Sequence, residues 1–145
     1  MERLLKSSTA SVVALLLAGG VAFQDIFAAS AATVAAIAIA SPSQGAEVGL
    51  QETVVASVRD TDLRVAVLVR ASNKDWWVQN DSARPERQEF VVVAQFGERG
   101  IGWGEIYEIV AVADRERRFG RGERFGSVPG TLYASRIVRV KKTRD

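Results

Sequence analysis

The chain has 145 residues, of which 25% are charged, and its 19 Lys and Arg against 17 Asp and Glu give a formal net charge of +2. This near balance argues against a nucleic-acid-binding protein, which normally carries a marked basic excess on one face. The sequence has no Cys and no His, which excludes disulfides, thiolate metal sites and Ser-His-Asp or Cys-His catalysis. We therefore expect no cofactor, no metal site and no enzymatic activity.

The N-terminal part of the chain is almost wholly apolar, whereas the rest alternates between apolar and polar residues. Arg3 and Lys6 precede an apolar stretch over residues 10–23, Gln24 and Asp25 interrupt it, and residues 26–40 resume it. We expect residues 1–34 to form a hydrophobic helix, and residues 35–145 to form the folded domain. A helix needs about 20 apolar residues to span a bilayer, so the first stretch alone is short.

Three interpretations of this N-terminal segment compete. An uncleaved helix over about residues 8–28 would anchor the chain in a membrane. A signal peptide would instead be cleaved at the small residues Ala29-Ser30-Ala31. In the third interpretation both apolar stretches are core helices that pack on the domain. We favour the anchor, and basic residues ahead of it predict a cytoplasmic N-terminus and an extracytoplasmic domain. Export after signal cleavage predicts the same compartment for the domain.

The remaining chain reads as strands separated by turn residues, with no intervening helical pattern of 10–15 residues to suggest parallel βαβ units. Val65, Val67 and Val69 alternate with other residues, which places them on one face of a strand. Seven strands are predicted, over residues 37–41, 52–59, 64–70, 75–79, 88–96, 105–113 and 132–142. We predict an all-β fold, a seven-stranded immunoglobulin-like antiparallel sandwich preceded by the hydrophobic helix.

The start of the domain carries a resemblance to known proteins. Residues 39–48 resemble the "I-x-S-P-x-x-G-x-x-V" opening of bacterial extracytoplasmic immunoglobulin-like domains. Residues 65–69, 76–79, 96–97 and 102–113 are similar to a group of uncharacterised bacterial proteins that are membrane-anchored or exported and carry one such domain at the C-terminus. The resemblance implies a fold and a setting but no catalytic residues. The chain departs from this pattern at residues 114–125, an arginine-rich loop where the relatives tend to have a longer insertion.

Tryptophan residues are the candidate binding residues. Neighbours in a strand point to opposite faces, so one of Trp76 and Trp77 should enter the core and the other should face solvent or a partner. An exposed ring could anchor a protein contact or stack on a sugar. We predict a binding surface formed by Trp76, Trp77, Gln79 and Trp103. The alternative is that one ring packs the core and the adjacent loop covers the other.

Arginines form a second candidate site. Five of them, interleaved with phenylalanines, could contact phosphate, lipid headgroups or an acidic polymer; they are Arg115, Arg117, Arg118, Arg121 and Arg124. The alternative is a solvated loop, since Asp114, Glu116 and Glu123 partly neutralise the cluster.

Four glycines, at positions 97, 100, 102 and 104, precede one of the predicted strands. Their spacing matches neither the G-x-G-x-x-G motif nor a Walker A loop, so they predict a tight bend rather than a phosphate-binding site.

Together these features predict a non-enzymatic, extracytoplasmic immunoglobulin-like module that is tethered at the membrane and binds another protein. A carbohydrate ligand at the same aromatic residues is one alternative. A structural accessory subunit of a membrane complex, held by helix packing through Gly19-Gly20, is the other. The sequence indicates no nucleic-acid partner.

Overall fold

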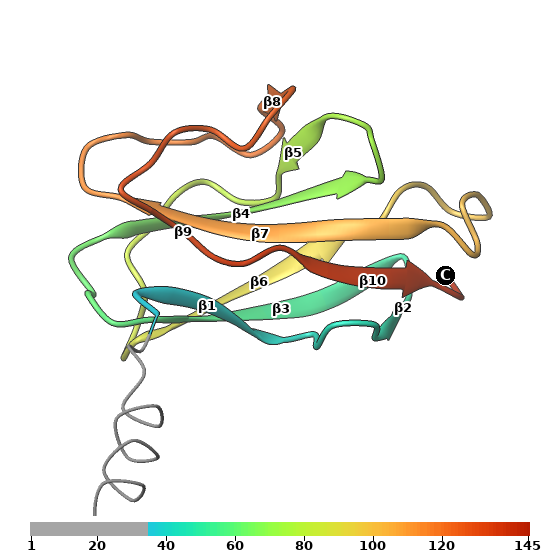
Figure 1. Ribbon diagram of the computed structural model, residues 1–145, viewed down its shortest axis with the longest axis horizontal. Coiled ribbons are helices and arrows are strands. Elements are labelled where there is room, and N and C mark those ends of the chain that lie inside the picture. Colours follow the sequence, from blue (N-terminus) through green and yellow to red (C-terminus); the bar gives the residue numbers. More distant parts are fainter. Residues whose placement is uncertain (1–34) are drawn as a thin grey trace, which may run out of the picture. The chain divides into compact units, whose positions relative to one another are not determined.

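The computed structural model describes residues 35–145, and their regular structure consists of ten β-strands in two sheets (Figure 1). The predicted hydrophobic helix over residues 1–34, with its anchor and signal-peptide alternatives, lies outside the described residues. Within residues 35–145, no helix is long and apolar enough to cross a bilayer. The two sheets form an all-β sandwich, as the alternating pattern predicts.

The smaller sheet has three antiparallel strands in the order β1-β3-β6, and the larger has seven. The three are β1 (Ile37–Ser41), β3 (Gln51–Val58) and β6 (Glu89–Gln95). The larger sheet has the order β2-β10-β7-β4-β5-β8, and β9 adds to β7. Its strands are β2 (Glu47–Val48), β4 (Arg64–Ala71), β5 (Trp76–Val78), β7 (Ile106–Asp114), β8 (Arg124–Phe125), β9 (Tyr133–Ala134) and β10 (Val138–Lys142).

The longer strands follow the predicted ones closely, and they divide between two sheets as in an immunoglobulin-like sandwich. The third, fourth, sixth and seventh predicted strands lie together in the larger sheet, and the other three form the smaller sheet. One pairing differs from the purely antiparallel prediction, because β2 pairs with β10 in parallel. The two-residue strands β2 and β8 were not predicted, since so short a segment carries no alternation of its own.

The predicted last strand over residues 132–142 is interrupted. Ala134 pairs with Val112 whereas Val138 pairs with Ile109, so one extra residue is inserted on this side of the ladder. Ser135 fills the interruption: its Oγ accepts a hydrogen bond from the Ala111 N–H at 2.9 Å, and its own N–H donates to the Ala111 carbonyl at 2.8 Å. A β-bulge therefore replaces the continuous strand, and it separates β9 from β10.

Both faces of the larger sheet are covered. Val65, Val67 and Val69 of β4 share one face, as predicted, and that face lies in the core between the sheets. The alternate residues Ala66 and Leu68 are also buried, in a second apolar cluster on the outer face of the sheet. Residues 115–137, here called the cover, run across this face in Figure 1 and include the short strands β8 and β9, which join the larger sheet at β5 and β7. From the cover, Phe119, Phe125 and Val128 pack against the outer cluster, together with Trp76, Val78, Val110 and Val112 of the sheet. The arginine-rich segment is thus a packed layer with exposed arginines rather than a wholly solvated loop.

Candidate functional site

A groove runs along the open side of the sandwich, beside strand β6. Three adjoining hollows make it up: two of them share Gln79, Gln95 and Arg121, and two share Phe90 and Val91. We call this feature the edge groove. Its hollow nearest Trp77 has a volume of about 540 Å³ and is also lined by Arg70, Lys74, Asp75, Glu98 and Tyr107, among others. The edge groove therefore combines aromatic rings with charged groups of both signs.

Trp77 lies at one end of the edge groove. Its position in β5 turns it away from the outer cluster, and 47% of the residue is exposed. The guanidinium of Arg124 lies over the indole ring, 5.4 Å from its centroid, and pairs with the Asp75 carboxylate at 3.5 Å. Asp75 and Arg124 thus restrain one side of an aromatic ring that remains accessible from the groove.

Gln79 links the two sheets across the edge groove. Its side-chain Nε2 donates to the Trp77 carbonyl at 3.0 Å, and its Oε1 accepts a hydrogen bond from the Gln95 N–H of β6 at 2.9 Å. Gln79 therefore fixes the width of the groove at this point.

Trp76 has a different environment from its neighbour. It is 1% exposed and belongs to the outer cluster, so it has no surface for a ligand in this arrangement. The Arg70 guanidinium lies 4.5 Å from its ring centroid and pairs with the buried Glu108 at 3.0 Å. Glu108 also pairs with Arg139 at 3.3 Å, so aromatic and charged side chains form a row across four strands. The structure confirms that the two neighbouring tryptophans face opposite ways.

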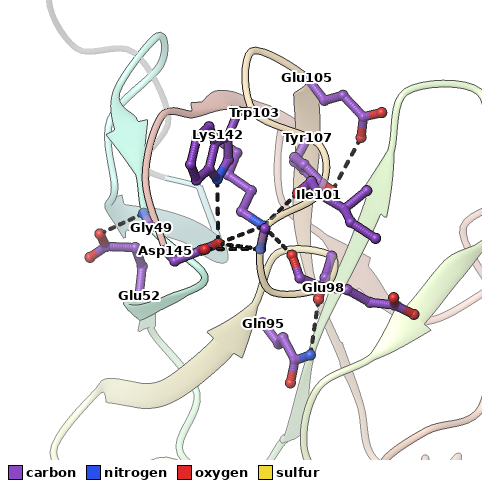
Figure 2. Close-up of polar contacts among 12 residues, drawn as sticks. Gly49, Glu52, Gln95, Glu98, Ile101, Trp103, Glu105, Tyr107, Lys142 and Asp145 are labelled. Carbon is purple, nitrogen blue, oxygen red and sulfur yellow. Dashed lines mark hydrogen bonds and ion pairs between the residues drawn. The ribbon is translucent and has the colours of Figure 1, made fainter.

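Trp103 lies on the loop over residues 97–105, which a buried lysine holds in place. Lys142 is fully buried, and its Nζ donates to the carbonyls of Glu98 at 2.6 Å and Ile101 at 2.8 Å. The Lys142 Nζ and the Trp103 Nε1 each lie 3.4 Å from the Asp145 Oδ1. Figure 2 shows the two side chains converging on this carboxylate. The Trp103 residue is 63% exposed, but it does not line the edge groove, so the predicted binding residues do not form one continuous surface.

Two ionisable groups that contact this loop, Asp145 and Tyr107, have shifted pKa values. The Gly100 N–H, the Trp103 indole and the Lys142 ammonium all donate hydrogen bonds to Asp145 and lower its carboxyl pKa, the first having the largest effect. Burial raises the pKa of Tyr107, and the neighbouring Glu105 carboxylate, 3.3 Å from its Oη, adds to the shift. Tyr107 therefore lines the groove as a neutral hydrogen-bond donor at neutral pH.

The predicted cluster of arginines does not converge on one point. Arg115 pairs with Asp60 at 2.9 Å. Arg117 donates to the Gly130 carbonyl at 2.8 Å and lies over the rings of Phe119 and Phe125, at 5.1 and 5.7 Å from their centroids. Arg124 belongs to the Trp77 site. The other two arginines of the cluster are Arg118 and Arg121. Their guanidinium groups have no hydrogen bond, ion pair or ring contact within residues 35–145. Contact of these arginines with an anion or lipid headgroup remains a prediction.

Asp114 ties the cover to the end of β7, and its lowered pKa predicts that the stability of the domain depends on pH. Its carboxylate accepts hydrogen bonds from the N–H groups of Arg117, Leu132 and Glu116, at 2.6, 2.9 and 3.1 Å, and these bonds, the first above all, hold its pKa below the usual value of an aspartate. A lowered folded-state pKa stabilises the fold at pH values above the unfolded-state pKa, and that stabilisation is lost as the pH falls through the folded-state pKa.

We expect Asp114→Asn to lower the urea midpoint at neutral pH and to lower it less as the pH falls below 3.8, because protonation removes the same charge from the natural chain. Urea denaturation across this pH range measures the difference. Asp62→Asn is the control, since this exposed carboxylate accepts no hydrogen bond in the described part of the chain. A constant difference between Asp114→Asn and the natural chain at all pH values would contradict the assignment.

Sequence reasoning found Trp77, Gln79 and Arg121 of the edge groove but not Tyr107, Lys74 or Glu98. Tyr107 reads as an ordinary strand residue, and its place in the groove depends on the glycines opposite. A Cβ at Gly97 would lie 2.3 Å from the Tyr107 Oη. The four glycines at 97, 100, 102 and 104 all have positive φ, which confirms the predicted tight bend. The four glycines were therefore the one feature of the sequence that could have indicated a side chain, here Tyr107, packed closely against this bend.

Comparison with solved structures finds a likeness of fold, whereas the comparisons with families and curated proteins find none. No family model matches the chain, and no curated protein matches it. A solved structure described as fibronectin(III)-like modules of Clostridium thermocellum CbhA is similar, with a TM-score of 0.42 and 16% identity over 74% of this chain and 94% of that one. The arrangement of the strands themselves, three in one sheet and the remainder in the other, identifies the described domain as an all-β sandwich.

Proposed function

We propose that the chain is a non-enzymatic interaction module that recognises another protein at the edge groove, with Trp77 as the main contact. The observation that carries this proposal is a half-exposed indole whose orientation is restrained by Arg124 and Asp75. Large aromatic side chains bury much area at little cost in conformational entropy and are enriched among residues that dominate binding energy. A restrained ring at the end of a groove is well placed for such a contact.

A protein partner fits the surroundings of Trp77 better than a carbohydrate does. A sugar binds by stacking on a ring face, and the Arg124 guanidinium occupies one face of this ring. Lys74, Glu98 and Arg121 add charges of both signs around the groove. An aromatic centre with a mixed polar rim is the usual composition of a protein interface. Carbohydrate binding through Trp77 is the alternative that the experiment below also detects.

We further propose that the module acts outside the cytoplasm and is tethered at a membrane by residues 1–34. Support comes from the order of basic and apolar residues there and from the resemblance of residues 39–48 to extracytoplasmic domains. Export after cleavage near Ala31 is the alternative for the N-terminus. An accessory role through the N-terminal helix is the alternative for function. Mass measurement of the native N-terminus in membrane and soluble fractions separates an anchor from a cleaved signal peptide.

Site-specific photo-crosslinking in cells of the source organism tests recognition at Trp77. A benzophenone side chain at position 77 should form adducts with another protein, and the same group at position 132 should not. Leu132 is a matched control because it is exposed to a similar extent but lies on the cover, away from the edge groove. Equal adducts at both positions would contradict protein recognition at Trp77, and adducts with glycan alone would favour the carbohydrate alternative.

A further inference from the structure

Strand β6 has one hydrogen-bonded edge and one open edge. The Val58 N–H donates to the Gln88 carbonyl, and the Phe96 N–H donates to the Leu50 carbonyl, both at 2.8 Å. Because backbone groups alternate along an antiparallel strand, the even-numbered residues 88–96 direct theirs towards β3. The odd-numbered residues 89, 91, 93 and 95 therefore direct their N–H and C=O groups away from the sheet.

Only the two ends of this open edge are occupied. The Glu89 N–H donates to the Glu86 carbonyl, and the Gln95 N–H donates to Gln79 Oε1, both at 2.9 Å. Between them, the N–H and C=O groups of Val91 and Val93 have no partner within residues 35–145. Unpaired backbone groups on a strand edge can pair with a further strand.

The side chain of Gln79 already imitates such a strand at Gln95. A glutamine carboxamide has the same donor and acceptor groups as a peptide unit. Here its oxygen accepts from the Gln95 N–H of β6, while its nitrogen donates to the Trp77 carbonyl. An added strand would continue this pairing from Gln95 to Val93 and Val91.

The space beside the open edge suits a single strand. A hollow of about 500 Å³ lies there, with Val91 and Val93 on one side and residues 79–81 on the other. Residues 79–81 stand opposite β6 across this hollow, and a wall on that side favours a narrow occupant such as one extended peptide over a second sandwich. Val91 and Val93 are 59% and 58% exposed, so a paired strand would also cover apolar surface on the outer face of the small sheet.

The positive charge of Arg121 further indicates what kind of ligand the edge groove would bind. Arg121 lines both the hollow beside β6 and the hollow beside Trp77. Its backbone N–H donates to Asp81 at 2.9 Å, but its guanidinium has no hydrogen bond or ion pair within the described part of the chain. A carboxylate on the ligand would supply a bidentate partner for this guanidinium.

We propose that the edge groove binds an extended peptide segment of a partner protein, which adds as a strand to β6 at Val91 and Val93. This inference rests on the proposed function and specifies its partner. The segment carries small apolar side chains beside the two valines and an acidic side chain at Arg121. Main-chain pairing supplies affinity in this mode of recognition, and alternate side chains supply specificity.

A displayed library of random linear peptides, selected on the full chain, provides the probe. We expect the selected peptides to contain an acidic residue, and to lose affinity about tenfold or more with Val93→Pro, which corresponds to about one hydrogen bond. Proline is tolerated on an edge strand where the N–H points outwards. Val93→Ala is the matched control, because it keeps the N–H and should bind within about threefold of the natural chain. Circular dichroism checks that both variants fold.

Amide hydrogen exchange on the natural chain keeps the inference testable if Val93→Pro does not fold. Bound peptide should slow exchange at Val91 and Val93, and Arg121→Gln should weaken binding. Peptides that depend on Trp77 but ignore Val93→Pro, without protection at the two valines, would overturn strand addition and leave recognition at Trp77 intact. Failure to select any peptide would overturn the inference as well. Dimerisation of the chain that Val93→Pro abolishes would overturn it in favour of pairing between two copies.

Discussion

Trp76→Ala is expected to lower the free energy of unfolding by about 3–5 kcal/mol, the usual range for removing a buried aromatic side chain. Trp76 is almost fully buried in the outer cluster, where the cover packs against the larger sheet. Its removal would leave a cavity beneath the Arg70 guanidinium and take away the ring over which that cation lies. Urea denaturation followed by circular dichroism measures the loss.

Trp77→Ala is the matched control for this substitution. The two residues are neighbours of the same type, and an arginine lies over each ring, but Trp77 is about half exposed. We expect Trp77→Ala to change the free energy of unfolding by no more than about 1 kcal/mol, because this residue is half exposed and its removal leaves no enclosed cavity. Equal losses for both variants would contradict the assignment of the two rings to opposite faces of β5.

The strands of the sandwich were predictable because apolar side chains, which face the core, alternate along each strand with side chains on the opposite face. In β3, Val54, Ala56 and Val58 enter the core while their neighbours are less buried, and a one-residue shift would expose all three. The bulge at Ser135 was not predictable in the same way. A serine among alternating residues is ordinary, and its role depends on meeting the Ala111 N–H and C=O groups.

The sequence also indicated that β4 is buried on its second face, but it did not indicate which segment covers that face. Ala66 and Leu68 stand between the core valines, and an unbroken apolar run of this kind is typical of a strand buried on both faces. Nothing in the run indicates which segment covers the second face. The cover instead looks like a solvated loop, because exposed arginines surround the buried Phe119.

In the candidate site, too, the features that depend on one strand could be predicted, and those that depend on contacts between distant segments could not. The adjacent tryptophans identified an exposed ring, since neighbours in a strand must face opposite ways. The edge groove could not be predicted, because it brings together residues 79–81, Arg121 and β6, which are distant in the sequence. The open edge of β6 likewise follows from the strand order, which alternation along single strands does not determine.

Gly97→Ala is expected to lower the free energy of unfolding by about 2–4 kcal/mol, through two separate effects. Gly97 has a φ of 71°, a left-handed conformation that costs a residue with a Cβ about 1–2 kcal/mol. The added Cβ would also lie 2.3 Å from the Tyr107 Oη, which is closer than such atoms approach. Tyr107 cannot easily move away, because it is buried and packs edge-on against Phe96 at a centroid distance of 5.6 Å.

Gly104→Ala separates the two effects. Gly104 also has a positive φ, of 84°, but a Cβ there would meet no atom within 4 Å. We expect this variant to lose only the conformational part, about 1–2 kcal/mol, so the difference between the two variants measures the contact with Tyr107. Chemical denaturation of both variants under the same conditions provides the comparison.

Tyr107→Phe should rescue part of the loss at Gly97. This change removes the Oη and leaves the ring carbon Cζ at 3.4 Å, a tight contact that a small shift of the ring can relieve. The single variant loses the hydrogen bond to Glu105, so a double-mutant cycle is needed to isolate the contact. We expect Gly97→Ala to cost at least about 1 kcal/mol less in the Tyr107→Phe background than in the natural chain. Equal costs in the two backgrounds would mean that the bend can move away from Tyr107, and that the glycine is needed for its backbone conformation alone.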